Sequence, residues 1–313
     1  MIAASIDAGT NTVLMTIAKE ITETKSLEII HEEHRFPRLG EGIESRGKIS
    51  DEKIKKFTEI LLKYVSVSRY FSARKVLLTG TSVFRRLDNI EEVKKIILEE
   101  TGLSLKVLTS EEEAKLSFLG ATSEIVTDKN VVMIDIGGGS TEVTLGNKTD
   151  ILFSQSFETG VVRLSNMFCD VYPPGPDKIE GIKAYIEKIT GEIVLPNSDE
   201  YIGVGIAGTP ITLSCIANMI REFRKENINN QILTIQQISI ITKTLLETPI
   251  SEMENKFGEI IRGREDLLLF GSLILQHIMG KLNLSKLVIS TNGLRQGVLL
   301  QHFFKIFDKY SVE

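Results

Sequence analysis

Short apolar runs alternate with longer amphipathic stretches along this chain, and this alternation predicts its secondary structure. The apolar runs predict strands at residues 2–6, 12–18, 27–33, 75–78, 105–108, 131–134, 141–145, 151–157, 201–204 and 287–290. The longer stretches predict helices at about 50–69, 90–100, 110–123, 209–222, 235–246 and 265–281, with a closing helix from about 295. Strands that alternate with helices in this way indicate mixed α/β layers.

Two of the predicted strands end in the same pattern. Residues 5–12 and 133–142 each run from an apolar strand into an aspartate, a glycine turn and small hydroxyl residues. Glycines let backbone N–H groups approach a phosphate closely, and a strand-end carboxylate such as Asp7 or Asp135 suits a metal ion. The two copies lie about one domain's length apart. The pattern therefore predicts a duplicated fold with a cleft between the copies that holds a phosphate.

The chain is long enough for two domains. It has 313 residues, of which 42% are apolar and 25% charged, which is enough for two cores. We expect a first domain over residues 1–122 and a second over 123–313, with a C-terminal helix at about 296–313 that packs back on the first domain.

Composition limits the setting and the partners. The only two cysteines, Cys169 and Cys215, are far apart and form no C-x-x-C, which favours a reducing cytoplasmic setting. No targeting segment precedes the first strand, and the most apolar stretch, 267–275, falls short of a membrane span. A net charge of −5 argues against a general nucleic-acid binder. We therefore expect neither a nucleic-acid partner nor a membrane.

Three familiar motifs can be tested against the sequence. Residues 203–208 fit G-x-G-x-x-G, but no acidic residue ends a second strand about 20 positions later, as a dinucleotide fold requires. Cys215 and Arg221 have the C-x5-R spacing of a cysteine phosphatase, but the residues between them are bulky and helix-like, so we expect Cys215 to be a buried small hydrophobe. No G-x-x-x-x-G-K-[ST] occurs.

The acidic run at residues 111–113 has two interpretations. Ser110 as the N-cap and Glu113 three positions later would form a capping box. A helix start that follows a strand can also face the cleft, where a carboxylate accepts a proton from a water that attacks a phosphate. Both interpretations are open because three consecutive acids leave spare carboxylates.

The chain contains five motifs in a specific order, at residues 6–12, 80–86, 110–114, 134–142 and 205–209. Two later segments, 262–266 and 290–297, continue the order. Over nearly the whole chain this order resembles the exopolyphosphatase and guanosine pentaphosphate phosphohydrolase (Ppx/GppA) family of the actin, Hsp70 and sugar-kinase superfamily. The resemblance implies two actin-like (ribonuclease H-like) domains, with mixed sheets flanked by helices and an interdomain cleft. Longer relatives carry a further helical, HD-like region, so the chain resembles the short two-domain form. Ala207 departs from the family pattern, in which glycine is common there.

The same resemblance implies roles for individual residues. Glu113 would be the catalytic base, and Arg85 would contact phosphate. Arg86 competes with Arg85 for the phosphate role, and only the register of the motif favours Arg85. Asp135 and Glu142 would hold Mg²⁺, with Mn²⁺ as an alternative, and Asp7 would be a further metal or water partner. The phosphate cradle would comprise Thr10, Asn11, Gly137, Gly138, Gly139, Ser140, Gly208 and Thr209. Arg264 and Arg295 would line the path of a long polyanion, form salt bridges or have a role at a helix end.

The implied activity is exopolyphosphatase, with water removing the terminal phosphate of inorganic polyphosphate. One alternative is hydrolysis of the 5′-phosphate of guanosine pentaphosphate. Other classes are an ATP-dependent small-molecule kinase of the same superfamily and a non-catalytic polyphosphate or nucleotide sensor. We expect a homodimer because relatives commonly form one.

Overall fold

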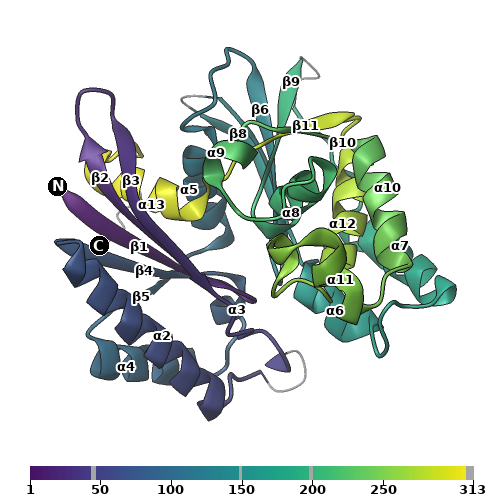
Figure 1. The fold of residues 1–313 in the computed structure, drawn as a ribbon. Helices are drawn as coiled ribbons and strands as arrows, with labels where there is room; N and C mark the ends of the chain where they lie inside the picture. The colour runs from purple at the N-terminus through teal and green to yellow at the C-terminus, as the bar shows by residue number, and fades with distance from the viewer. Residues whose placement is uncertain (44–46, 148–149, 197–199, 308–313) are drawn as a thin grey trace. The chain divides into compact units, whose positions relative to one another are not determined.

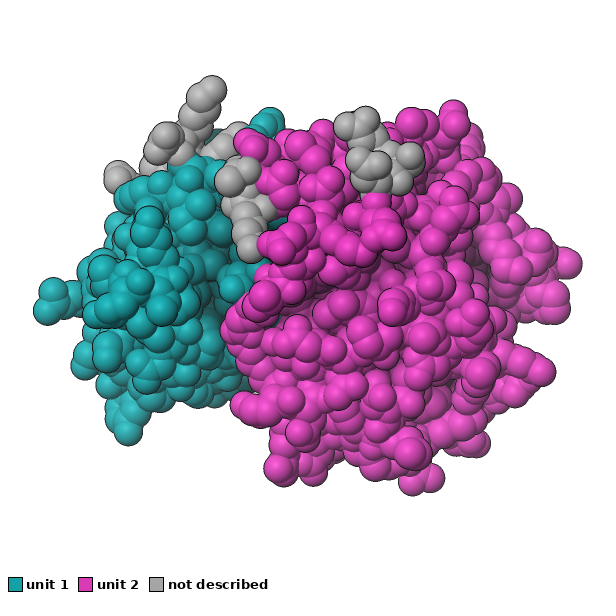
Figure 2. All heavy atoms as spheres, turned by 90° about the horizontal axis from the view of Figure 1, so that it is seen from above, with its two compact units in different colours: residues 1–123, 292–313 teal, residues 124–291 magenta. Residues whose placement is uncertain are grey.

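The computed structural model describes residues 1–43, 47–147, 150–196 and 200–307 of the chain. These residues form two compact units, coloured separately in Figure 2. Unit 1 consists of Met1–Ser123 together with Asn292–Glu313, and unit 2 consists of Glu124–Thr291. Figure 1 labels the elements of both units.

Unit 1 contains a five-stranded mixed sheet in the order β3-β2-β1-β4-β5. The first three strands form an antiparallel meander, and β4 and β5 continue the sheet in parallel with β1. The strands are β1 (Ile2–Ala8), β2 (Val13–Ile21), β3 (Ser26–Arg35), β4 (Lys75–Gly80) and β5 (Leu105–Val107). The helices are α2 (Asp51–Tyr70), α3 (Ser82–Arg85), α4 (Ile90–Thr101), α5 (Ser110–Thr122) and α13 (Leu294–Phe304).

Unit 2 contains a six-stranded mixed sheet in the order β10-β11-β9-β6-β7-β8. Its strands are β6 (Asn130–Ile136), β7 (Thr141–Gly146), β8 (Ile151–Phe157), β9 (Tyr201–Ile206), β10 (Ile232–Thr234) and β11 (Lys286–Ile289). Its helices are α6 (Val161–Phe168), α7 (Pro176–Thr190), α8 (Gly208–Ala217), α9 (Lys225–Ile228), α10 (Ile235–Leu246), α11 (Ile250–Phe257), the 3₁₀-helix η1 (Glu259–Ile261) and α12 (Leu268–Lys281).

The two sheets repeat one topology. In unit 2, β6, β7 and β8 form an antiparallel meander like β1, β2 and β3, and β9 and β11 continue in parallel like β4 and β5. The short strand β10 adds an antiparallel edge to the second sheet only. The predicted duplication of an α/β fold with mixed sheets is therefore confirmed.

Helices cover both faces of the unit 1 sheet (Figure 1). Large side chains of α2, including Phe57, Leu61 and Tyr64, pack with apolar residues of β1 and β2 on one face. On the other face α13 packs against α5 and β1. The two helices approach so closely that a Cβ on Gly120 would collide with the carbonyl of Gly293. This close packing fixes the helices that carry Glu113 and Arg295.

Several predicted boundaries differ from the structure. The closing helix ends at Phe304, because Lys305 takes a left-handed conformation (φ 48°), so the expected helix over 296–313 is too long, and 308–313 lie outside the described residues. Helix α8 ends at Ala217 rather than 222, before Met219, which is also left-handed (φ 56°). Helix α12 begins at Leu268 rather than 265.

Within the described ranges, no helix has both the length and the apolar character that a membrane span demands.

Candidate active site

Glu113 does not cap its own helix. Thr109 is the N-cap of α5: its hydroxyl accepts a hydrogen bond from the Glu112 amide at 3.1 Å, and the Glu112 carboxylate accepts one from the Thr109 amide at 3.0 Å. The expected capping box of Ser110 and Glu113 is therefore wrong by one residue, because Ser110 is already the first helical residue. Capping uses Glu112 and leaves the Glu113 carboxylate for another role.

Glu113 is instead paired with Arg85. Arg85 Nη1 donates to Glu113 Oε2 at 2.6 Å and to the carbonyl of Leu108 at 3.0 Å. Glu113 is only 9% exposed, and burial raises the pKa of its carboxyl above the usual range, although the Arg85 charge and hydrogen bond act in the opposite direction. Arg86 donates to the carbonyl of Ser82 and takes no part in this pair. A carboxylate with a raised pKa is suited to accept a proton near neutral pH.

Asp7 lies near this pair, at the end of β1. Burial raises its pKa to about 7; the negative charge of Glu113 contributes to the rise and the positive charge of Arg295 opposes it. Asp7 Oδ1 is buried and accepts no hydrogen bond from any residue that the structure describes. Buried polar oxygens almost always have a partner, so this atom fits a ligand such as a metal ion or a metal-bound water.

Arg295 is held by an ion pair. Its Nη1 lies 3.2 Å from Glu32 Oε1 and donates to the carbonyl of Met15, also at 3.2 Å. The same Glu32 oxygen accepts hydrogen bonds from Thr16 and Gln296. The structure thus places Arg295 in a salt bridge, from which its charge acts on Asp7.

The loop after β1 is held by backbone hydrogen bonds, one within its own turn and two from the segment that follows β3. The Gly9 amide donates to the carbonyl of Thr12 at 2.9 Å and closes the turn. The carbonyls of Thr10 and Asn11 accept from the amides of Gly40 and Arg38, at 2.8 and 3.1 Å. Thr10 and Asn11 are both buried. The loop is therefore fixed through its carbonyls by the segment that follows β3.

The glycine loop of unit 2 repeats this arrangement. The Gly137 amide donates to the carbonyl of Ser140 at 3.0 Å, which is the same turn. The first amides of α6 hold the loop: Val161 donates to the Gly137 carbonyl at 3.0 Å and Val162 to the Gly138 carbonyl at 2.8 Å. These hydrogen bonds hold the loop from Gly137 to Ser140 in a fixed shape.

Gly160 lies directly before α6, and its backbone packs closely against the glycine loop. A Cβ at this position would lie 2.6 Å from the backbone of Gly138 and Gly139, which cannot move aside as a side chain can. We expect Gly160→Ala to lower the free energy of unfolding by about 2 kcal/mol and to weaken phosphate binding. Urea unfolding and phosphate titration would measure both effects.

Gly280→Ala is the matched control. Gly280 is an exposed residue of α12 with open space around its Cβ position. Alanine at this helical site should stabilise the protein by up to about 1 kcal/mol. If Gly160→Ala behaved like Gly280→Ala, the close contact with the glycine loop would have no importance.

Asp135 and Glu142 form a carboxylate pair in unit 2. They lie directly opposite each other on β6 and β7, so their side chains share one face of the sheet. Glu142 is 2% exposed, and its Oε1 accepts a hydrogen bond from Ser156 at 2.7 Å. In unit 1 the equivalent partner of Asp7 is Leu14, so the first sheet has no such pair.

This pair fits the expected cation. Within the described ranges no group of three or more histidine, cysteine, aspartate or glutamate residues is arranged to hold a metal. Mg²⁺, however, is usually bound through one or two carboxylates, with water and substrate phosphates as its other ligands. The two carboxylates of Asp135 and Glu142 meet that requirement.

A third loop joins β9 to α8. Ala207 has φ 63° and ψ −171°, a region that only glycine normally occupies, so its backbone is strained. Arg264 lies against the next residue, because a Cβ on Gly208 would be 2.5 Å from Arg264 Nε. Thr209 is buried in the first turn of α8. The guanidinium of the half-buried Arg264 is thus placed beside a helix N-terminus, which favours anions.

The cysteine-phosphatase interpretation is excluded. Cys215 is fully buried, and burial raises the pKa of its thiol to about 12, which disfavours the thiolate nucleophile. Arg221 lies beyond the end of α8, and its guanidinium donates to the carbonyls of Asn255 and Lys256. The two residues therefore form no phosphate site.

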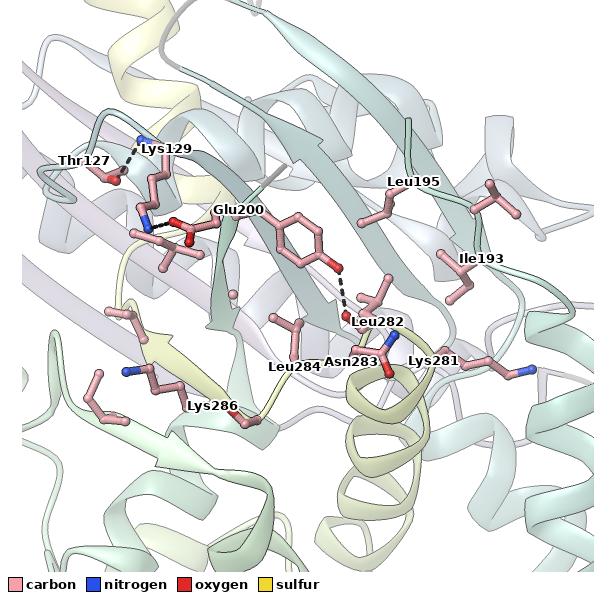
Figure 3. A pocket seen from close by; sticks show the side chains of 17 residues that line it. Thr127, Lys129, Ile193, Leu195, Glu200, Lys281, Leu282, Asn283, Leu284 and Lys286 are labelled. Atoms are coloured by element: carbon pink, nitrogen blue, oxygen red, sulfur yellow. Dashed lines mark hydrogen bonds and ion pairs between the residues drawn. The ribbon is translucent and has the colours of Figure 1, made fainter. Parts of the chain in front are cut away.

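An open pocket of about 900 Å³ in unit 2 is separate from the glycine loops and the carboxylate pair (Figure 3). The pocket is lined by residues at the amino ends of β6, β9 and β11, namely Lys129, Tyr201 and Lys286. The loops with Gly137 and Gly208 follow the carboxyl ends of β6 and β9. None of the residues expected to bind phosphate or metal lines this pocket, and we do not assign it to the site.

Sequence reasoning missed four residues that support the site: Gly40, Gly160, Glu32 and Ser156. The two glycines follow β3 and β8, the third strands of the two sheets. Extending the duplication by one strand would have found them. The ion pair of Glu32 with Arg295 joins residues that are far apart in the sequence, so no local sequence pattern predicts it.

Two ribonuclease H-like sheets with an aspartate-glycine turn after the first strand of each define the class of actin-like proteins with two domains. Within that class, a sequence model of the Ppx/GppA phosphatase family matches residues 16–305, so the chain belongs to this family. The family expected from the order of the motifs is thereby confirmed.

Three similar proteins illustrate the match. The bifunctional 3-dehydroquinate synthase/phosphatase of Fusobacterium nucleatum is 25% identical over 312 residues, covering 95% of this chain and 46% of that protein. Exopolyphosphatase 2 of Mycobacterium tuberculosis is 26% identical over 311 residues, covering 95% of this chain and 97% of that protein. The crystal structure of the Aquifex aeolicus Ppx/GppA family member has a TM-score of 0.82 and 27% identity and covers 99% of both chains. The chain thus spans about half the length of the first of these proteins.

Proposed function

We propose that this protein is an exopolyphosphatase, which uses water to remove the terminal phosphate of inorganic polyphosphate. The observation that carries the proposal is the buried Glu113, which is free of helix capping and paired with Arg85 at 2.6 Å. A base placed to deprotonate water suits hydrolysis. The similarity to an exopolyphosphatase over 97% of that protein's length supports the choice of substrate.

The proposed site residues form two half-sites, one in each unit. In unit 1, Glu113 accepts the proton of the attacking water, and Arg85 neutralises charge on the phosphate. In unit 2, the amides of residues 137–140 and 208–209 bind phosphate oxygens. Asp135 and Glu142 would hold Mg²⁺ or Mn²⁺ in unit 2, and Asp7 would bind a metal ion or its water in unit 1. When bound, the ion supplies positive charge that offsets the charge on the phosphate oxygens.

Guanosine pentaphosphate is the second candidate substrate. The matched family carries both names, Ppx and GppA, and both substrates end in a phosphoanhydride. The half-sites described above bind terminal phosphates, so they act on either substrate.

The test is phosphate release from purified protein with Mg²⁺ and long-chain polyphosphate, guanosine pentaphosphate, or ATP with candidate acceptors. We expect orthophosphate from polyphosphate, none after removal of divalent ions with EDTA, and recovery when Mg²⁺ or Mn²⁺ is added. Faster release from guanosine pentaphosphate would make the second candidate the function. Release from neither polyphosphate nor guanosine pentaphosphate would overturn the hydrolase proposal.

We also propose a cytoplasmic homodimer. Both cysteines are free, which supports a reducing setting. The dimer rests on the family resemblance alone, and light scattering of the purified protein tests it.

A further inference from the structure

Ser156 completes a row of polar residues across three strands of unit 2. It lies directly opposite Glu142 on the ladder between β7 and β8, as Asp135 does on the ladder between β6 and β7. Residues paired in this way point to one face of the sheet. The Ser156 hydroxyl donates to Glu142 Oε1 at 2.7 Å. The row therefore places a hydroxyl on one side of Glu142 and a carboxylate on the other.

This hydrogen bond controls the orientation of the carboxylate. Rotation of a glutamate carboxylate about its last torsion has broad energy minima, so packing alone fixes it poorly. A hydrogen bond from a hydroxyl to an ionised oxygen is about twice as strong as a neutral one. Because Glu142 is 2% exposed, water competes little for that oxygen. The Ser156 hydroxyl is thus placed to orient the Glu142 carboxylate beside Asp135.

Unit 1 provides an internal comparison. The equivalent row there consists of Asp7, Leu14 and His34. The sheet without the glutamate also lacks the hydroxyl beside it. Ser156 and Glu142 therefore occur together on the same row of the second sheet, as expected if the serine hydroxyl orients the glutamate carboxylate.

We propose that Ser156 is a positioning residue that orients Glu142 in a seat for a divalent cation formed with Asp135. The inference rests on the proposed function for the role of that seat. Ser156 acts through Glu142 and contacts neither the ion nor the substrate. Hydrogen bonds that orient metal ligands typically contribute about 10- to 100-fold to metal affinity.

Two nearly isosteric variants isolate the hydroxyl. Ser156→Thr keeps it, whereas Ser156→Val replaces it with a methyl group; both residues favour strands, so β8 should form in both proteins. The measurement is the affinity for Mn²⁺ without substrate, from the electron paramagnetic resonance signal of the free ion. We expect about 10-fold weaker binding in Ser156→Val and near wild-type binding in Ser156→Thr.

Ser154→Ala is the matched control. Ser154 lies two residues away on the same face of β8, where its hydroxyl is 3.4 Å from that of Thr144. It should bind Mn²⁺ as the wild type does. Equal affinity in Ser156→Val and the wild type would overturn the proposal, and so would unchanged affinity in Glu142→Gln, since the seat would then lie elsewhere.

The metal measurement is independent of turnover. A protein that bound Mn²⁺ at Glu142 with an affinity that depended on Ser156, but released no phosphate from polyphosphate or guanosine pentaphosphate, would overturn the hydrolase proposal and support this one. Thermal unfolding of each variant confirms that it is folded before its affinity is compared.

Discussion

Glu113→Gln is expected to reduce phosphate release by about 10³-fold, because general-base catalysis contributes about 10²- to 10⁴-fold. Glutamine cannot accept the proton of the attacking water. Its amide oxygen can still accept the hydrogen bond that Arg85 Nη1 donates to Glu113 at 2.6 Å, so the arginine stays in place. Substrate affinity should therefore change little. Single-turnover kinetics with direct binding of polyphosphate separate the two quantities.

Glu112→Gln makes the same chemical change one residue earlier. Glu112 belongs to the capping box with Thr109, a role that glutamine also fills. Turnover and stability should both remain near wild type. The base assignment fails if Glu113→Gln keeps full turnover, or if it lowers stability as the loss of a helix cap would.

Arg85→Gln is expected to lower turnover at neutral pH by about 10²- to 10³-fold, the effect of removing one group that stabilises charge in the transition state. It should also change the pH profile. The Arg85 charge and hydrogen bond lower the pKa of Glu113 against the larger effect of burial. Without them the pKa of Glu113 rises, so a higher pH is needed to keep the base ionised. The acidic limb of the kcat/KM profile should move to higher pH, and activity should partly recover there.

Arg86→Gln is the control for this experiment, because Arg86 donates to the carbonyl of Ser82 and not to Glu113. It should leave the acidic limb where it is in the wild type. If the limb moved in Arg86→Gln and stayed in place in Arg85→Gln, the two arginines would have to exchange roles.

The fold was predictable where periodicity and termination signals agreed. Helix α10 runs over the predicted residues 235–246, because Thr234 and Gln237 form a capping box before a strongly periodic segment. The duplicated strand endings likewise predicted two sheets of the same kind. Several short elements, such as α3, α6 and β10, were missed because they are too short to display a period, although β5 and β11 were predicted from their apolar runs.

The site was harder to predict, and the start of α5 shows why. Thr109 and Ser110 are neighbouring hydroxyl residues, and each is followed three positions later by a glutamate, Glu112 or Glu113. The sequence therefore contains two overlapping capping boxes of equal quality. Only the end of β5 and the pairing of Glu113 with Arg85 select one of them. The residues missed near β3 and β8 act through contacts made after the chain has folded back on itself.

The docking of α13 on α5 has a consequence for biosynthesis. Unit 1 takes its first 123 residues from the start of the chain and residues from Asn292 onward from the other end. Chains emerge from the ribosome N-terminus first, and domains generally fold as units. Unit 2 is therefore fully synthesised while the helix that bears Glu113 still lacks the partner whose backbone it meets at Gly120. The contact between α5 and α13 therefore forms only after unit 2 has been synthesised, so unit 1 completes its packing last.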